Sequence, residues 1–325
     1  MNSSNPTICV VIPYYQIAAE PLIRAIRSIL AQQGVERPMV LIVDDSSPLP
    51  AEPIIAEHFP NHKDFIRIIV QKNGGAANAR NTGLDNLPEE TTYVAFLDSD
   101  DEWTPDHLSN ALRVFEADCD FYFAGYTRTD WEKDRFSQMG LAIEQHKCID
   151  DERRLFEYVG DALIPIMRNL MVKTSTVVYR KSVLADIRFP ENLILGEDDV
   201  FWAKAVRRAR KSGFCAGIEL IMGKGVNISQ GGAWGDVRSI QLMTQNMQKW
   251  KLIPELLPDE PKLESLRMEH IHQLRTTLAA TVWYRLRRGM GLPMRHLINF
   301  TLADPAWLFS LWTPLFMRIK GKRHA

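Results

Sequence analysis

The chain of 325 residues is predicted to adopt an α/β fold, in which a doubly wound, mostly parallel sheet is flanked by helices and followed by a helical C-terminal extension. Apolar runs typical of buried strands alternate with helix-like segments through the first third of the chain. This alternation favours a parallel sheet, because each crossover helix returns the chain to the same edge. From residue 239 onward the apolar spacing is helical, which predicts the extension.

The elements of the first third follow from the spacing of apolar residues. Residues 8–12 form a continuous β-branched run, as expected of a strand buried on both faces. Helical spacing predicts a helix over 20–33, which Gly34 ends. The same reasoning predicts strands at 39–43, 65–70 and 92–97, and helices at 53–58 and 76–84.

The remainder of the chain is assigned in the same way. A helix at 105–116 and a strand at 121–126 precede a long polar segment; a strand is expected at 172–179 and a helix from Glu197. We place a main domain at 1–238, divided into 1–103 and 104–238, and a basic helical region at 239–325. Prolines that should break the helices of this last region are Pro254, Pro258, Pro261, Pro293, Pro305 and Pro314.

Composition is that of an ordinary globular protein with a basic C-terminus. Residues are 46% hydrophobic and 24% charged, and the net charge of −1 argues against nucleic-acid binding. The segment 285–325 holds eight Lys or Arg against one acidic residue, Asp304. The four cysteines lack C-x-x-C spacing and are expected to be core residues in a reducing compartment. With no leader-like N-terminus and no long apolar run, the chain is predicted to be cytoplasmic.

Three carboxylates, Asp98, Asp100 and Asp101, directly follow the strand expected at 92–97. They could be a helix cap, or they could bind a divalent cation. Asp98 and Asp100 point the same way if strand geometry continues past the strand end, whereas Asp101 and Glu102 are expected to cap the next helix. Carboxylates suit Mg²⁺ or Mn²⁺ with positions left for phosphate oxygens, so we favour a metal that neutralises a leaving diphosphate.

Other chemically active residues follow neighbouring strands. Ligands of such sheets bind beyond the carboxyl ends of the strands, so these loops should converge on one site. Pro13 and Tyr15 end the first strand, and Asp44 and Asp45 end the second. The pair of aspartates could form an Asx-turn before Pro48, or accept hydrogen bonds from a base or ribose, and both can hold.

The segment Asn73-Gly-Gly-Ala-Ala-Asn-Ala-Arg80 is neither G-x-G-x-x-G nor GK[ST], so dinucleotide and P-loop functions are disfavoured. Arg80 should lie in the first turns of a helix whose N-terminus attracts anions, although a surface arginine is the simpler alternative. The eight histidines show no zinc-site grouping.

A second acidic run, Glu197-Asp198-Asp199, stands at a helix start. It could complement the helix dipole or supply a general base for a hydroxyl nucleophile. Trp234, among glycines, either packs in the core or stacks on a flat ligand face.

Residues 300–317 mix large apolar side chains with helix breakers before a basic end. Such a segment could lie on an anionic membrane surface, and we favour that over packing against the main domain.

Several motifs, taken in order, resemble the inverting family 2 glycosyltransferases of GT-A fold, over residues 1–103 and about 173–210. They are Val-Val-Ile-Pro13-Tyr-Tyr, Val-Asp44-Asp45-Ser-Ser, Gly74-Gly-x-x-x-Ala-Arg80-Asn81-x-Gly83, Phe-Leu-Asp98-Ser-Asp100-Asp101-x-Trp103 and Gly-Glu197-Asp198. Beyond about residue 240 the chain is loosely similar to bacterial exopolysaccharide and O-antigen enzymes.

The resemblance implies a role for each matching residue. Asp44 or Asp45 would hold the nucleotide base, Asp98 would lie by ribose and diphosphate, and Asp100 would bind the metal. The Glu-Asp pair supplies the base, here Asp198, with Asp199 as the alternative. Donor-binding candidates are Pro13, Tyr15, Asp44, Asp45, Asn73, Arg80, Asp98 and Ser99, and acceptor-side candidates are Glu197 and Trp234.

The expected activity is Mn²⁺- or Mg²⁺-dependent transfer of one sugar from a nucleotide-sugar, a UDP-sugar by preference, to a hydroxyl of a growing glycan or glycolipid at the cytoplasmic face of a membrane. Processive relatives carry Gln-x-x-Arg-Trp, and here Ala233 replaces the arginine, which favours single transfer. A nucleotidyltransferase should instead show a glycine-rich triphosphate loop where Pro13 stands. A non-catalytic binding module should have lost one acidic cluster, and both are present.

Overall fold

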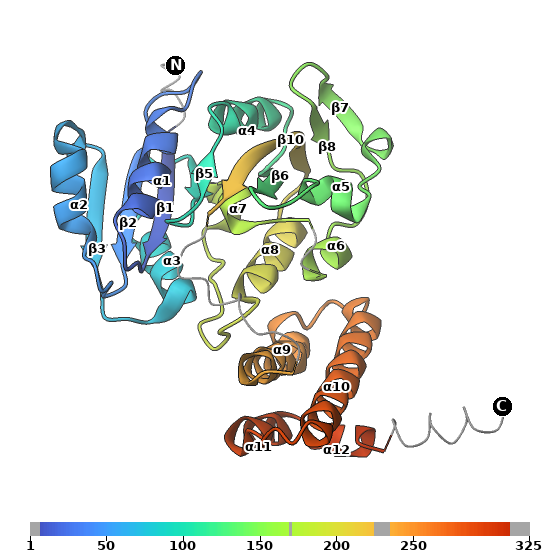
Figure 1. Cartoon of the computed structure of the whole chain (residues 1–325). Helices are drawn as coiled ribbons and strands as arrows, with labels where there is room; N and C mark the ends of the chain where they lie inside the picture. The colour runs from blue at the N-terminus through green and yellow to red at the C-terminus, as the bar shows by residue number, and fades with distance from the viewer. Residues whose placement is uncertain (1–6, 169–170, 224–234, 313–325) are drawn as a thin grey trace. The chain divides into compact units, whose positions relative to one another are not determined.

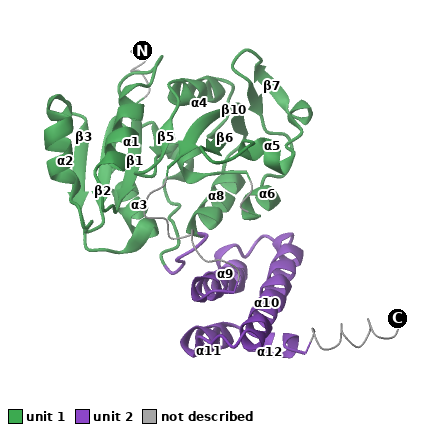
Figure 2. Ribbon diagram, in the orientation of Figure 1, with its two compact units in different colours: residues 1–191, 197–227 green, residues 192–196, 228–325 purple. Residues whose placement is uncertain are grey.

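The computed structural model describes residues 7–168, 171–223 and 235–312 (Figure 1). The chain divides into two units, residues 1–191 with 197–227, and residues 192–196 with 228–325 (Figure 2). Our placement of a main domain at 1–238, with halves that meet near residue 103, and of a separate region at 239–325 stays a prediction.

Ten strands in the described part of unit 1 form one sheet, in the order β3-β2-β1-β4-β9-β6-β10-β8-β7, with β5 paired to β10. All strands but β5, β8 and β9 run in the same direction, so the expected mostly parallel sheet is confirmed. The strands are β1 Ile8–Tyr14, β2 Met39–Asp44, β3 Ile66–Val70, β4 Tyr93–Phe96, β5 Glu102–Trp103, β6 Phe121–Arg128, β7 Lys147–Asp150, β8 Leu155–Glu157, β9 Val178–Arg180 and β10 Ser212–Met222.

Helices cover both faces of this sheet, as a doubly wound fold requires. One hydrophobic core joins α1, α2 and α4 to side chains such as Val10, and the other joins α3, α6, α7 and α8 to side chains such as Val11. These helices and α5 are α1 Glu20–Leu30, α2 Ala51–His58, α3 Gly75–Asp85, α4 His107–Glu116, α5 Arg135–Met139, α6 Leu163–Met167, α7 Lys181–Leu184 and α8 Glu197–Arg208.

The strand expected at 172–179 is wrong over most of its length. A 3-10 turn, Thr174–Thr176, occupies its centre, and only β9 at its end is extended. The reason is local hydrogen bonding: the hydroxyl of Thr176 donates to the carbonyl of Lys173, which competes with a strand ladder. The cysteine expectation is also wrong at one position, because Cys148 is exposed while Cys9, Cys119 and Cys215 are buried.

Unit 2 consists, in its described part, of α9 Val237–Leu256, α10 Leu263–Arg287, α11 Met294–Ala303 and α12 Trp307–Ser310. Pro254 lies inside α9 rather than ending it, which corrects the expected break; the helix continues for two residues because a proline in the last turn disturbs few hydrogen bonds. The carboxylate of Asp304 is buried and pairs with Arg275 and Lys251, which ties α9, α10 and the end of α11 together.

The C-terminal apolar residues divide between two environments. Phe300 and Trp307 pack inside unit 2, whereas the side chains of Leu302 and Phe309 are 79% and 81% exposed. Residues 313–317 of the predicted membrane segment lie outside the described part. No helix in the described ranges is long and apolar enough to cross a membrane.

Candidate active site

The carboxyl ends of β1, β2 and β4 lie side by side. Tyr14 at the end of β1 is in register with Asp44 at the end of β2, and the backbone N–H of Asp45 donates to the carbonyl of Tyr14 over 3.0 Å. Pro13 lies within β1, while Tyr15 is the first residue beyond it and is 42% exposed. The loops that carry the candidate donor residues therefore begin at one edge of the sheet.

Asp44 forms the turn that its sequence context allows. Its two carboxylate oxygens accept the backbone N–H groups of Ser47 and Ala51, each at 2.8 Å. Because Ala51 is the first residue of α2, one buried carboxylate closes the turn and satisfies the helix N-terminus. Asp44 thus has a structural task that accounts for both of its oxygens.

Asp45 instead joins the β2 loop to the start of α3. Its carboxylate oxygens accept the backbone N–H groups of Gly74 and Gly75, each at 2.8 Å, and Gln71 donates to it at 2.7 Å. Asn73 donates from its side-chain amide to the backbone carbonyl of Asp45 at 3.0 Å. Asp45 and Asn73 shape one loop, and their contact with a nucleotide stays a prediction.

Arg80 is buried, so the simpler alternative of a surface arginine is wrong. One terminal nitrogen of its guanidinium lies 2.8 Å from a carboxylate oxygen of Asp98, and the other lies 3.1 Å from one of Glu197. The ring of Phe189 packs 5.3 Å from the guanidinium carbon. Arg80 therefore links the two acidic clusters, which are far apart in sequence.

Asp98 faces two cations. Besides Arg80, the ammonium group of Lys173 lies 3.5 Å from its second carboxylate oxygen. Burial opposes ionisation of Asp98, but Arg80 and Lys173 outweigh it and lower the pKa of Asp98 to about 2. The sequence does not predict that Lys173 contacts Asp98, because Lys173 lies in the segment 172–179, for which a strand is expected.

Asp101 and Glu102 do not cap the next helix, which corrects the sequence prediction. α4 begins at His107, behind Asp106, and Glu102 lies in β5. The buried carboxylate of Asp101 accepts the hydroxyl of Ser175 at 2.6 Å and the backbone N–H of Gly223 at 2.9 Å. Those partners are remote in sequence, so local spacing could not reveal them.

Burial raises the pKa of Asp101 to about 7; Lys173 opposes the shift, and Asp98 and Asp100 add to it. The backbone N–H of Asp101 donates to the carbonyl of Asp98 at 3.0 Å, which closes a turn. The strand geometry assumed for Asp98 and Asp100 therefore stops at Phe96.

Ser99 and Asp100 form the middle of this turn. The buried hydroxyl of Ser99 accepts the side-chain amide of Gln16 at 3.0 Å, which connects the turn to the loop after β1. Asp100 is partly exposed, and its backbone carbonyl lies so close to Gly223 that an added Cβ there would be 1.6 Å away. Within the described ranges, no group of three or more His, Cys, Asp or Glu side chains could hold a metal ion.

The second acidic cluster forms the first turn of α8. Asp199 is buried, whereas Asp198 is partly exposed and accepts the hydroxyl of Thr174 at 3.4 Å. Burial, with repulsion from Asp198, raises the pKa of Glu197 to about 7, although Arg80 lowers it. Of the two candidate bases, Asp198 is the one that solvent reaches. Trp234 lies outside the described residues.

The chain is similar in sequence to several known proteins. The family model described as Glycosyl transferase family 2 matches residues 9–184, which include the first acidic cluster. The succinoglycan biosynthesis protein ExoW of Rhizobium meliloti is 33% identical over 316 residues, which cover 93% of each chain. The amylovoran biosynthesis glycosyltransferase AmsB of Erwinia amylovora is 31% identical over 58% of this chain and 60% of its own.

Two solved structures share the fold. The structure of S. aureus TarS 1-349 in complex with UDP-GlcNAc has a TM-score of 0.58 at 18% identity, covering 94% of this chain and 81% of that chain. The mannosyltransferase PcManGT from Pyrobaculum calidifontis, in complex with GDP-Man and Mn²⁺, has a TM-score of 0.53 at 17% identity, covering 95% and 86%. The predicted GT-A fold is thereby confirmed, and the chain belongs to glycosyl transferase family 2.

Proposed function

We propose that this chain is an inverting glycosyltransferase that transfers one sugar from a UDP-sugar to a hydroxyl of a growing cell-surface polysaccharide. The observation that supports the proposal is the double ion pair of Arg80, whose guanidinium contacts Asp98 of the first acidic cluster and Glu197 of the second. Relatives named for succinoglycan and amylovoran biosynthesis support a polysaccharide acceptor. The UDP-GlcNAc complex of TarS supports a UDP-sugar donor.

The donor would lie across the loops after β1, β2 and β4. Tyr15 is exposed at this edge, and Asp45 with Asn73 holds the adjoining loop in shape. Lys173 and Arg80 already neutralise Asp98, so Asp100 is the carboxylate better placed to hold Mn²⁺ or Mg²⁺ together with diphosphate oxygens. Such a metal supplies Lewis-acid stabilisation of the leaving diphosphate. The Mn²⁺ complex of PcManGT supports this assignment.

Asp198 would act as the general base. Its carboxylate accepts the proton of the acceptor hydroxyl while the hydroxyl oxygen bonds to the anomeric carbon, on the side opposite to the departing UDP. The bond to the diphosphate breaks as the new one forms, which inverts the anomeric centre. Asp199 is buried and suits a structural role. The pairing of Arg80 with Glu197 holds the turn that carries Asp198.

The proposal also concerns the acceptor. One sugar is transferred per acceptor, and the acceptor is lipid-linked at the cytoplasmic face of a membrane. Leu302 and Phe309 expose apolar side chains near the basic C-terminus, which suits an anionic lipid surface. The variant Leu302→Gln/Phe309→Gln should float less with vesicles containing phosphatidylglycerol than the unchanged chain does. Equal flotation of the two proteins would contradict membrane contact through these side chains.

Binding and turnover of nucleotides test the proposed function directly. UDP should bind more tightly than GDP, ADP or CMP, and its affinity should rise with Mn²⁺. In a panel of nucleotide-sugars, the chain should then consume a UDP-sugar slowly even without acceptor. If GDP binds better than UDP, the donor assignment is wrong. If UDP binds and no nucleotide-sugar is consumed, the chain is a binding module.

A further inference from the structure

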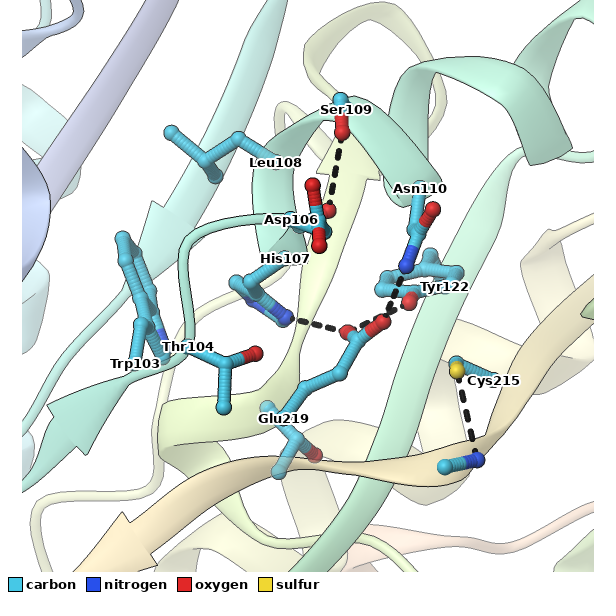
Figure 3. Close-up of polar contacts among 12 residues, drawn as sticks. Trp103, Thr104, Asp106, His107, Leu108, Ser109, Asn110, Tyr122, Cys215 and Glu219 are labelled. Atoms are coloured by element: carbon cyan, nitrogen blue, oxygen red, sulfur yellow. Dashed lines mark hydrogen bonds and ion pairs between the residues drawn. The ribbon is translucent and has the colours of Figure 1, made fainter. Parts of the chain in front are cut away.

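A buried carboxylate, Glu219 of β10, lies at the centre of a polar cluster outside the site described above (Figure 3). It accepts the amide of Asn110 at 2.6 Å on one oxygen, and on the other the hydroxyl of Tyr122 at 2.6 Å and Nδ1 of His107 at 2.8 Å. All four side chains are buried. A buried carboxylate is costly unless its hydrogen bonds are made, and here both oxygens are bonded.

Glu219 occupies an irregular position of its strand. The pairing of β10 with β6 shifts register between Cys215 and Ile218 and again between Ile218 and Leu220. At such an irregularity a residue is left without a partner in the ladder, and Glu219 has no partner among the pairs of β10 with β6. The directional bonds of its side chain to α4 and to Tyr122 of β6 therefore add to the ladder in holding this part of β10 against its neighbours.

The polar cluster around Glu219 contacts β5, the strand that follows the turn Asp98–Asp101. The ring of His107 lies 4.6 Å from that of Trp103, and the backbone N–H of Thr104 donates to the carbonyl of Glu219 at 3.0 Å. The indole N–H of Trp103 in turn donates to the carbonyl of Ser175. Ser175 accepts the backbone N–H of Asp98 on its hydroxyl oxygen, so contacts run without a gap from Glu219 to the turn.

The end of β10 reaches the same turn from the other side. Gly223 stands four residues after Glu219, donates its backbone N–H to Asp101 and abuts the carbonyl of Asp100. A shift of β10 along its axis would move Gly223 and so push or release the two aspartates. The position of the turn thus depends on the register of β10.

We propose that Glu219 is a positioning residue: through β10 and Trp103 it holds the turn Asp98–Asp101 in the geometry that binds the metal and the diphosphate. That the turn binds a metal and a diphosphate rests on the proposed function. That Glu219 fixes the position of the turn does not. Glu219 itself is too deeply buried to touch a donor.

The variant Glu219→Gln tests the proposal, because the amide keeps the volume but turns one accepting oxygen into a donor. In the full chain without nucleotide, hydrogen exchange of residues 97–104 should become at least about tenfold faster. The Mn²⁺ concentration that half-saturates UDP binding should rise about tenfold, the lower end of the effect of outer-shell partners on metal affinity.

Asp120→Asn is the matched control. Asp120 is also fully buried and is bonded by Arg180 and Arg210, but it precedes β6, at the opposite end of that strand from the acidic turn. The Asp120→Asn variant should lower the midpoint of thermal unfolding. It should not accelerate hydrogen exchange of residues 97–104 or change the Mn²⁺ concentration that half-saturates UDP binding. Equal changes in both variants would mean that Glu219 acts on global stability only, which overturns the proposal.

Tyr122→Phe provides a milder variant if Glu219→Gln does not fold. It removes one of the three bonds and should shift exchange and Mn²⁺ requirement in the same direction, by a smaller factor. If both variants fold and hydrogen exchange of residues 97–104 is unchanged in both, the proposal is wrong. If only Tyr122→Phe folds, unchanged exchange in that variant overturns the proposal. If the unchanged chain fails to bind UDP, the proposed function is wrong, and the exchange arm still decides whether Glu219 holds the turn.

Discussion

The two acidic clusters look alike in sequence and differ in structure. Each has three carboxylates close to the start of an expected helix, and helix capping was an alternative for both. The cluster Glu197–Asp199 does begin a helix, α8. The cluster Asp98–Asp101 instead forms a turn between two strands and is held by Ser175 and Gly223. A run of acids near a helix therefore does not reveal its role; the cations and donors around it do.

The clusters also differ in charge compensation. Asp98 has two cations within 3.5 Å and a pKa of about 2, whereas Glu197 has Arg80 and a raised pKa. The first cluster thus combines an anion fixed at any physiological pH with Asp100 at the surface, which suits a diphosphate–metal site. The second offers a solvent-accessible carboxylate, Asp198, which suits proton transfer. A raised pKa does not by itself separate the clusters, because the pKa of Asp101 in the first cluster is also about 7.

Removing the cation that joins the clusters should have the largest effect. Arg80→Met leaves Asp98 and Glu197 without their shared partner, and breaking a buried ion pair on one side typically costs about 3–5 kcal/mol. Urea unfolding should show a loss of this size. Arg188→Met, which breaks an exposed pair with Asp85, should cost less than about 1 kcal/mol. Equal losses for the two variants would show that Arg80 is no more than a surface cation.

A methyl group at Gly223 should disturb the first cluster alone. The added Cβ would meet the backbone carbonyl of Asp100 at 1.6 Å, so the turn or the end of β10 must move. Gly223→Ala should weaken Mn²⁺-dependent UDP binding by more than about tenfold. Gly140→Ala is a control whose added Cβ meets nothing within 4 Å, although its positive φ carries backbone strain. Normal UDP affinity in Gly223→Ala would contradict the assignment of the turn to donor binding.

The raised pKa of Glu197 predicts a pH trend in stability. Between the ordinary value of 4.5 and about 7 the folded chain keeps a proton that the unfolded chain has lost. The free energy of unfolding should therefore fall as pH rises through this window, with a further part from Asp101, whose pKa is also about 7.

Glu197→Gln should make this fall smaller, since the amide does not titrate. Urea unfolding at about pH 5 and about pH 7.5 measures the difference. Asp134→Asn is a suitable control, because the pKa of Asp134 lies below its ordinary value and its loss should not flatten the trend. A fall of the same size in Glu197→Gln and the unchanged chain would contradict the burial assigned to Glu197.

Asp101→Asn should have the smallest effect. With a pKa of about 7, Asp101 is neutral in a large share of molecules at neutral pH, and the amide can still accept from Gly223. Since Ser175 can accept from the amide nitrogen, we expect a change below about 1 kcal/mol in unfolding free energy. A loss as large as that of Arg80→Met would show that Asp101 is ionised and carries the turn by its charge.

The sequence allowed the framework of the site to be predicted, but not its connections. The apolar runs of β1, β2 and β4 and the aspartates at or after the strand ends are local signals. They predict a parallel sheet with a candidate site at the carboxyl ends of its strands. Lys173 and Gly223 reach the same turn from more than 70 residues away, and no periodicity records such contacts.

The errors arise from side-chain hydrogen bonds, some remote in sequence and some local. Asp101 had a plausible local task as a helix cap, and remote donors from Ser175 and Gly223 replaced it. The segment 172–179 had the apolar composition of a strand, but its threonine and serine hydroxyls bond to nearby backbone and to Asp101 instead. At Asp101, polar partners distant in sequence outweighed local propensity, and in the segment 172–179 a local bond from a side chain to the backbone did so as well.

We assign metal and donor binding to the first acidic cluster and proton transfer to the second. Comparing Asp100→Asn with Asp198→Asn tests these two roles most directly. We predict that Asp198→Asn binds UDP with Mn²⁺ as the unchanged chain does, while transfer to acceptor falls by about 10²–10⁴-fold, the usual contribution of a general base. Asp100→Asn should lose the Mn²⁺ dependence of UDP binding. Near-normal transfer by Asp198→Asn, or Mn²⁺-dependent UDP binding that persists in Asp100→Asn, would contradict the roles assigned to the two clusters.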